Sequence, residues 1–223
     1  MATRTRHTER REDALSRERI VDAAVEMLDT AGEGGLTFRA LSAQLRTGPG
    51  AIYWHVTNKS ELLAAATDAV LAGVTTADAA GDTPEATIRT VALGVFDAID
   101  AHPWIGAQLA RVASQSATLQ IFERIGQQVQ ALGVPGTAQF DAASALLNYI
   151  LGVAGQNAAN ARAQEPGTNR SDVLGAESAV WASLDPGRYP FIRNIAGQLR
   201  DHDDRAQFLA GLDLILAGIA GLR

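Results

Sequence analysis

The sequence predicts an all-α protein with a small N-terminal head of three helices and a larger C-terminal helical body. Apolar residues recur at spacings of three and four from residue 17 to the end of the chain, which places them on one face of successive helices. Gly and Pro separate these segments, and the sequence has no stretch with the alternating pattern of a β-strand.

Composition narrows the class of protein further. The chain has 223 residues, 47% of them hydrophobic, and no cysteine, so it can bury a core but offers no disulfide, thiolate nucleophile or Cys-based zinc site. Polar residues and six arginines occupy positions 1–19, which argues against a signal peptide. The apolar runs at 142–159 and 208–222 contain polar residues, so we expect no membrane span and a cytoplasmic location.

Charge is distributed unevenly along the chain. Residues 1–63 carry equal numbers of acidic and basic side chains, whereas residues 64–223 carry the whole net charge of −6. Between positions 34 and 60 the only charged residues are Arg39, Arg46 and Lys59. An acidic body behind a locally positive head would repel phosphate everywhere except at the head.

The head is predicted from capping residues and helix breakers. Ser16 caps a helix over 17–31, and glycines at 32, 34 and 35 end it. Thr37 caps a second helix that ends at 47–48, and Pro49 suits the first position of a short third helix that reaches His55. Two short helices joined by a tight turn indicate a helix-turn-helix, whose second helix enters the major groove of DNA.

The body is predicted as a succession of helices. Thr57 or Asn58 caps the first of them, which runs to Gly73. The later helices are expected at 84–101, 104–113, 118–132, 137–163, 175–184, 191–199 and 204–222. Breaks containing Pro or Gly separate most of them.

The short third helix carries an unusual set of side chains. Its first turn, Pro49-Gly50-Ala51, is nearly free of bulk, so its backbone can approach DNA closely. The aromatic run Tyr53-Trp54-His55 follows, and aromatic residues of this kind are buried unless they have something to contact. The alternative is that Tyr53 and Trp54 only wedge the head together.

Residues 20–63 resemble the DNA-binding domain of the TetR family of bacterial transcriptional regulators. The resemblance rests on the register of Leu36-Thr37-Phe38-Arg39-Ala40-Leu41 and of Ile52-Tyr53-Trp54-His55-Val56-Thr57-Asn58-Lys59. It implies that one group of side chains lies near base edges, namely Arg39, Pro49, Gly50, Ala51 and Trp54. It implies that a second group lies near phosphates, namely Thr37, Tyr53, His55 and Lys59.

Two positions depart from the family pattern. Arg46-Thr47 stands where Gly-Val is common, and Pro49-Gly50-Ala51 lacks the polar side chain that related proteins have at the head of the recognition helix. Direct hydrogen bonds to bases are therefore expected to be sparse. Contacts with thymine methyl groups and DNA shape would supply more of the specificity.

The second half of the chain resembles the C-terminal domain of the same family. The matching motifs are His102-Pro103-Trp104, Asn148-Tyr149-Ile150-Leu151-Gly152, Asp185-Pro186-Gly187-Arg188-Tyr189-Pro190 and the helix from Phe208 to Ile219. The resemblance implies an effector pocket, for which we expect the residues Phe96, His102, Trp104, Leu109, Phe122, Ile125 and Tyr149. Leu109 replaces the His that serves as metal ligand in a tetracycline–magnesium site, so we expect neither a metal nor tetracycline. Plain core packing is the alternative for each of these residues.

A single head makes few contacts with DNA, so useful affinity requires two heads one helical turn apart. We therefore expect a homodimer, held by the helices over 137–163 and 204–222. The expected interface residues are Leu147, Leu151, Ala154, Leu212, Leu216 and Ile219. The alternative is that these stripes face only the core of their own chain.

Together these features predict a ligand-responsive transcriptional regulator: a repressor that a small apolar or amphipathic molecule releases from a palindromic operator. We expect no enzymatic activity and no cofactor. The expected units are a basic arm over 1–16, a DNA-binding domain over 17–63, and an effector-binding and dimerisation domain over 64–223. The arginine-rich segment from Arg4 to Arg11 either reaches a minor groove of the DNA or belongs to a disordered tail.

Two rival classes remain open at this point. One is a helical carrier or enzyme with a vestigial head, and the other is a helical interaction scaffold. The run Asp201-His202-Asp203-Asp204 could mimic a metal cluster, but we read it as a solvated start of the last helix.

Overall fold

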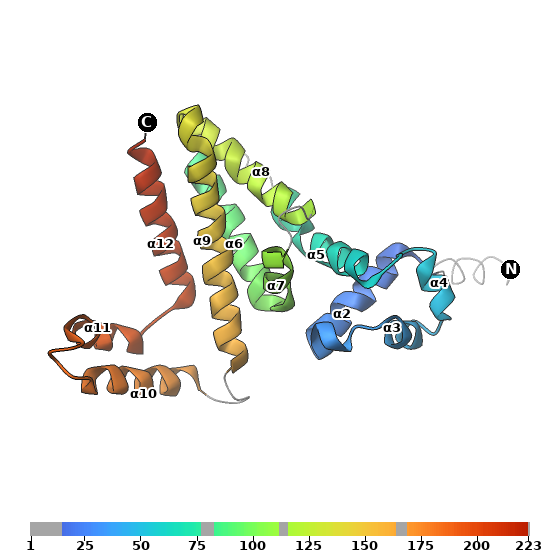
Figure 1. The fold of residues 1–223 in the computed structure, drawn as a ribbon, viewed down its shortest axis with the longest axis horizontal. Helices are drawn as coiled ribbons and strands as arrows, with labels where there is room; N and C mark the ends of the chain where they lie inside the picture. The colour runs from blue at the N-terminus through green and yellow to red at the C-terminus, as the bar shows by residue number, and fades with distance from the viewer. Residues whose placement is uncertain (1–14, 77–82, 112–115, 164–168, 223) are drawn as a thin grey trace, which may run out of the picture.

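A computed structural model describes residues 15–76, 83–111, 116–163 and 169–222. These residues form helices and turns without any β-strand, which confirms the all-α prediction (Figure 1). The helices are α2 (Arg17–Gly35), α3 (Phe38–Gln44), α4 (Pro49–Tyr53), α5 (Lys59–Thr76), α6 (Pro84–Ala101), α7 (Trp104–Arg111), α8 (Ser116–Ala131), α9 (Gly136–Ala163), α10 (Arg170–Ser183), α11 (Pro190–Arg200) and α12 (Asp204–Ala220). The arginines of the N-terminal arm lie outside the described residues.

The head consists of α2, α3 and α4, which lie together at one end of the molecule (Figure 1). Its centre is a set of side chains with no exposed area, contributed by all three helices: Ile20, Leu41 and Ile52. The Ser16 side chain accepts a hydrogen bond from the Arg19 N–H, as the capping prediction requires. Gly32 interrupts α2 with φ 65° and ψ −175°, a conformation that only glycine adopts readily. The regular part of α2 therefore ends at residue 31, as predicted, and a short further turn follows the break at Gly32.

Helix α5 connects the head to the body without interruption. It packs against α2 on one side and against α6 and α8 on the other, and its buried residues include Leu62, Ala66 and Leu71. The expected boundary between residues 63 and 64 lies inside this helix. Head and body are therefore joined by one continuous helix, which can transmit a rotation of the body to the head.

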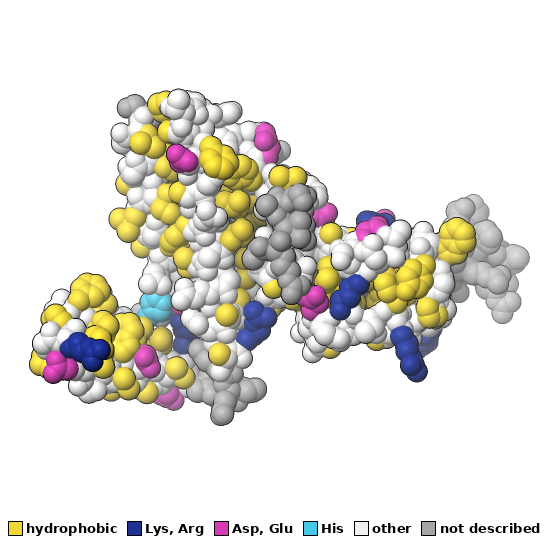
Figure 2. Space-filling model, in the orientation of Figure 1, with side chains coloured by type: hydrophobic (Ala, Val, Ile, Leu, Met, Phe, Trp, Pro, Cys, Tyr) yellow, Lys and Arg dark blue, Asp and Glu magenta, His cyan; other side chains and the backbone are white. Residues whose placement is uncertain are grey.

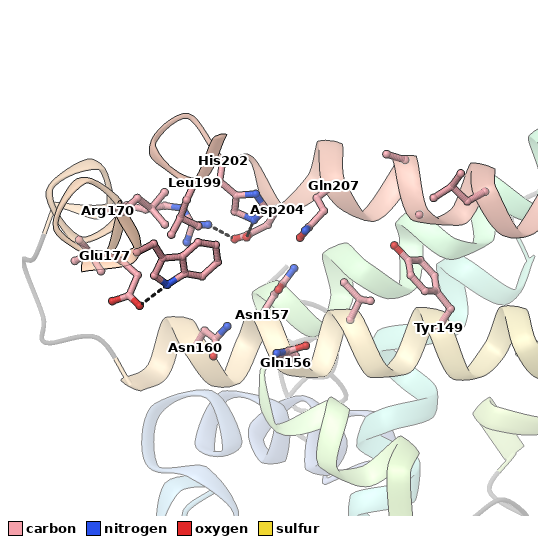
Figure 3. A pocket seen from close by; sticks show the side chains of 17 residues that line it. Tyr149, Gln156, Asn157, Asn160, Arg170, Glu177, Leu199, His202, Asp204 and Gln207 are labelled. Atoms are coloured by element: carbon pink, nitrogen blue, oxygen red, sulfur yellow. Dashed lines mark hydrogen bonds and ion pairs between the residues drawn. The ribbon is translucent and has the colours of Figure 1, made fainter. Parts of the chain in front are cut away.

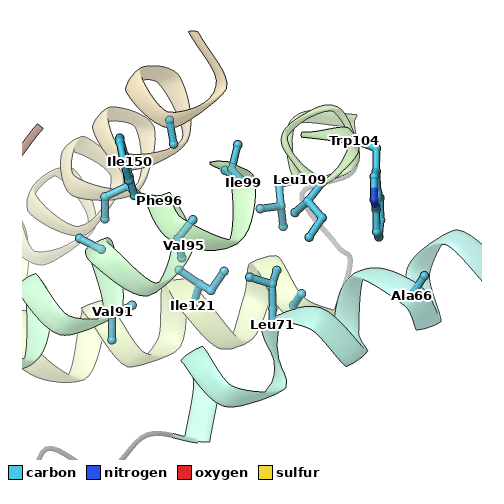
Figure 4. Close-up of a cluster of buried hydrophobic side chains, with 14 of the residues drawn as sticks. Ala66, Leu71, Val91, Val95, Phe96, Ile99, Trp104, Leu109, Ile121 and Ile150 are labelled. Atoms are coloured by element: carbon cyan, nitrogen blue, oxygen red, sulfur yellow. The ribbon is translucent and has the colours of Figure 1, made fainter. Parts of the chain in front are cut away.

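The buried side chains of the body belong to a hydrophobic cluster that also includes those of the head. Figure 4 shows a part of this cluster, to which α5, α6, α7, α8 and α9 contribute. The Phe208 ring lies between two other rings, with centroid distances of 4.7 Å to Phe96 and 5.7 Å to Tyr149. The Tyr149 hydroxyl donates a hydrogen bond of 2.9 Å to the Phe208 carbonyl. Partial desolvation raises the pKa of Tyr149 above its usual value. These contacts fasten α12 to α9.

Helices α10 and α11 form a hairpin that projects from the body (Figure 1). The buried Ser178 hydroxyl donates to the Ala196 carbonyl at 2.7 Å, which ties the two helices together. Helix α10 begins at Arg170 rather than at the predicted residue 175. The Asn169 side chain caps it by accepting from the Ser171 N–H, and this cap lies in a polar stretch that periodicity alone reads as a loop.

Among the described helices, none is long and apolar enough to cross a membrane.

The ring stack around Phe208 predicts a large effect of its removal. Phe208→Ala should lower the free energy of unfolding by about 3–5 kcal/mol, because a fully buried ring is lost and a cavity remains. Phe191→Ala is the matched control, since Phe191 is 69% exposed, and it should stay within about 1 kcal/mol of the parent. Urea unfolding at one fixed protein concentration measures both. Equal losses in the two variants would contradict the assigned core.

Candidate nucleic-acid interface and its connection to the body

Helix α4 has one buried side chain, and most of its other residues are exposed. Ile52 is fully buried, whereas Tyr53 is 52% exposed and Trp54, which caps the helix, is 88% exposed. Hydrophobic side chains lie at the surface of the head beside basic ones in Figure 2. Helix α4 and its C-cap thus expose two aromatic side chains, and the exposed Arg39 and Arg46 lie on α3 and in the turn that precedes α4.

The two aromatic residues play different parts. The Tyr53 ring stacks on Phe38 of α3, with centroids 4.6 Å apart and an interplanar angle of 29°. Tyr53 therefore helps to join α3 and α4, as the alternative interpretation expected. Trp54 remains almost wholly open to solvent, so head packing does not account for it.

The other predicted DNA-binding residues surround α4. Pro49 and Gly50 are exposed, Ala51 and His55 are half-buried, and Arg39 is exposed on α3. The Thr37 hydroxyl accepts a hydrogen bond of 3.1 Å from the Ala40 N–H, so it caps α3 while its side chain stays at the surface. The first turn of α4 offers backbone and small apolar groups but no side-chain hydrogen-bond donor.

Lys59 has a structural contact that sequence reasoning did not foresee. Its ammonium group donates to the Glu33 carbonyl at 2.5 Å and joins the end of α2 to the start of α5. If Lys59 also contacts a phosphate, its ammonium group has to be shared between the phosphate and the Glu33 carbonyl.

A capping arrangement fixes the start of α5 directly after α4. The Thr57 N–H and hydroxyl donate to the Glu61 carboxylate at 2.9 and 2.6 Å, and the Glu61 N–H donates to the Asn58 side chain at 2.9 Å. The Thr57 hydrogen bonds hold the pKa of Glu61 below its usual value. Several short contacts therefore fix the position at which α5 begins.

The head is joined to the body by a polar cluster, which we call the Asp29 clasp. The Asp29 carboxylate on α2 lies 2.8 Å from His102 Nδ1 and accepts a hydrogen bond of 2.8 Å from Trp104 Nε1. Nearby, the Gln108 amide donates to the Glu33 carboxylate at 3.1 Å. Sequence reasoning assigned His102 and Trp104 to an effector pocket and missed Asp29, because only the fold brings these distant positions together.

The remaining expected pocket residues have varied surroundings. Phe96, Leu109 and Ile125 are buried in the core, and Phe122 makes an edge-to-face contact with Phe140. Tyr149 lines a cavity of about 930 Å³ between α9, α10 and α12 (Figure 3). The other expected pocket residues do not line this cavity.

The wall of this cavity is rich in polar side chains. Amide groups line it from Gln156, Asn157, Asn160 and Gln207. At one end Asp204 pairs with Arg170 at 2.6 Å and with His202 at 3.0 Å, while Asp203 caps α12 by accepting from the Ala206 N–H. Over the described residues no group of three or more His, Cys, Asp or Glu side chains is arranged to hold a metal.

The expected interface residues divide into two groups. Leu147 and Leu151 are partly buried on α9. Four others are at most 5% exposed and belong to the core of their own chain, as the alternative interpretation proposed: Ala154, Leu212, Leu216 and Ile219. The neighbouring face of α12 is open instead, with Leu214 76% exposed.

Comparison with known proteins extends over nearly the whole chain. Residues 20–66 match the model of bacterial regulatory proteins of the tetR family, and residues 78–222 match the tetracyclin repressor-like C-terminal domain. A transcriptional regulator of Saccharopolyspora erythraea with a helix-turn-helix is 28% identical over 92% of this chain and 85% of its own length.

Two solved structures are also similar. The transcriptional regulator SCO7222 of Streptomyces coelicolor, a TetR protein, is 56% identical over 94% of this chain and 99% of its own, with a TM-score of 0.86. BioQ, solved with its natural double-stranded DNA operator, is 25% identical over 93% of this chain and 99% of its own, with a TM-score of 0.64. With its helix-turn-helix head and its C-terminal body both matched, the chain belongs to the TetR family of bacterial transcriptional regulators.

Proposed function

We propose that the protein is a ligand-responsive repressor whose α4 reads an operator duplex. The observation that carries this proposal is the exposure of Trp54, which is 88% open to solvent next to the fully buried Ile52. An aromatic side chain displayed in this way on a rigid support serves a contact with another molecule. A protein acting on the bacterial chromosome would work in the cytoplasm, without enzymatic activity.

In the proposed complex the first turn of α4 enters the major groove. Pro49, Gly50 and Ala51 would face thymine methyl groups, and Arg39 and Trp54 would supply hydrogen bonds to base edges. A second group would face phosphates, namely Thr37, Tyr53 and His55, with Lys59 sharing its ammonium group between a phosphate and Glu33.

Two copies of the chain are needed to place two heads on successive turns of the groove, about 34–36 Å apart. We propose that the dimer forms through the open faces of α9 and α12, where Leu147, Leu151 and the exposed Leu214 lie. The cavity between α9, α10 and α12 includes Leu214 in its wall. It would therefore lie at the interface rather than inside one chain.

The effector would be a small apolar or amphipathic molecule bound in the body. We place it among the aromatic and aliphatic side chains of α6 to α9, next to Trp104. Movement of α7 would change the Asp29 clasp and tilt α2, because His102 and Trp104 both bind Asp29 directly. The effector would then favour a spacing of the heads that no longer fits two half-sites.

Trp54→Ala and Arg39→Ala test base reading. Each should weaken binding to a duplex selected from a random pool by about 1–3 kcal/mol relative to unselected duplex, and leave unfolding nearly unchanged because both side chains are exposed. Fluorescence anisotropy on the two duplexes measures the difference. An equal loss on both duplexes would refute a base-reading role, and failure of the parent protein to enrich any duplex would refute the proposed function.

Leu214→Arg tests the proposed dimer. A charged side chain in place of an exposed leucine of the proposed interface should separate the copies, so the mass measured by light scattering should fall to the 23.5 kDa of one chain. Leu119→Arg is the matched control, because Leu119 is 52% exposed on α8. A dimer that persists in Leu214→Arg would show that another surface pairs the chains.

Asp29→Ala tests the clasp. The buried indole N–H of Trp104 would lose its acceptor, which should lower stability by about 1–3 kcal/mol and speed amide exchange at the end of α2. Asp22→Ala, an exposed change on the same helix, should do neither. Hydrogen–deuterium exchange of both variants provides the comparison. Unchanged amide protection at the end of α2 in Asp29→Ala would show that the clasp does not hold α2 to the body.

A further inference from the structure

The turn between α3 and α4 closes with a specific pair of backbone hydrogen bonds. The Thr47 N–H donates to the Ser42 carbonyl at 2.9 Å, and the Arg46 N–H donates to the Ala43 carbonyl at 3.2 Å. With Leu45 as the C-cap of α3, these are the two bonds of a Schellman motif. The motif places residue 46 in the left-handed region of backbone conformation, where φ is 53°.

Glycine is the usual residue at this position of the motif, because a Cβ atom makes the left-handed conformation unfavourable. Among the described residues, Arg46 is the only non-glycine with positive φ, whereas Gly32 and Gly133 are the glycines that adopt it. At position 46 the chain therefore has an arginine in a backbone conformation that favours glycine. A strained residue of this kind is a reason to look for a functional contact.

Among the described residues, no contact accounts for the Arg46 side chain. It is exposed, and its guanidinium forms no hydrogen bond or ion pair with the described residues. It lies in the turn between α3, which carries Arg39, and α4, which Trp54 caps. Lys59 at the start of α5 is also basic, but it already donates to the Glu33 carbonyl.

We propose that Arg46 contacts a backbone phosphate of the operator beside the groove that α4 enters. A guanidinium forms a bidentate contact with phosphate oxygens and remains charged at any relevant pH. The contact would compensate for the first turn of α4, which has no polar side chain to offer DNA. This inference rests on the proposed function, and it adds a DNA contact at a position where the family commonly has glycine.

Arg46→Gly separates binding from folding. The variant should melt at a higher temperature than the parent, because glycine relieves the backbone conformation. It should nevertheless bind a random-sequence duplex more weakly, with the slope of log K against log salt reduced by about 0.9, or about eightfold weaker binding at about 0.1 M salt. Because the variant is expected to be more stable, a loss of affinity could not be attributed to unfolding.

Two further variants serve as controls. Arg46→Lys keeps the charge and should retain the salt slope of the parent. Arg188→Ala removes an exposed arginine from the turn before α11, so it matches the change in net charge but should leave the slope unchanged. A parent protein that binds the duplex while Arg46→Gly keeps the same slope would overturn the role of Arg46. A parent that binds no duplex would instead overturn the proposed function.

Discussion

The structure depends most on the burial of Ile52 in the head. Helix α4 has five residues, far fewer than the roughly 12–15 that an isolated helix needs for marginal stability in water. Its conformation and direction therefore come from its surroundings: the burial of Ile52 in the same hydrophobic cluster as Ile20 and Leu41, the Tyr53–Phe38 stack, and the capping contacts at the start of α5. The exposure of Trp54 has functional meaning only because these contacts hold it in place.

The position of the head relative to the body also depends on specific contacts. Among the described residues, the connections with defined polar geometry include the Asp29 clasp and the Gln108–Glu33 hydrogen bond, beside the continuous helix α5. Polar contacts of this type stabilise one arrangement and are lost when partners move by about an ångström. Lys59 extends the connection, since it binds the Glu33 backbone while Gln108 binds the Glu33 side chain.

Much of the fold could be predicted because its boundaries are local. Gly32, Pro49 and the Ser16 and Thr37 caps determine backbone conformation within a few residues, and the structure places helix ends close to them. The start of α10 was wrong because an Asn cap in a polar stretch gives little periodic signal. Periodicity also cannot say what covers an apolar face, so the stripe through Leu212 and Leu216 was assigned to a partner although it faces the core of its own chain. The clasp depends on residues more than 70 positions apart, which no local pattern reveals.

In the proposed dimer, two copies hold their recognition helices one helical turn of DNA apart. Because the chain has no cysteine, Ser60→Cys introduces a single labelling site per copy at an exposed position in the first turn of α5. Pulsed dipolar spectroscopy on the spin-labelled protein bound to a selected duplex then measures the separation of the heads. We predict a single peak in the distance distribution between the two labels, near the helical repeat of about 34–36 Å. Its width should be that of the label tethers. Absence of a dipolar signal, or a broad distribution unrelated to the helical repeat, would contradict the account.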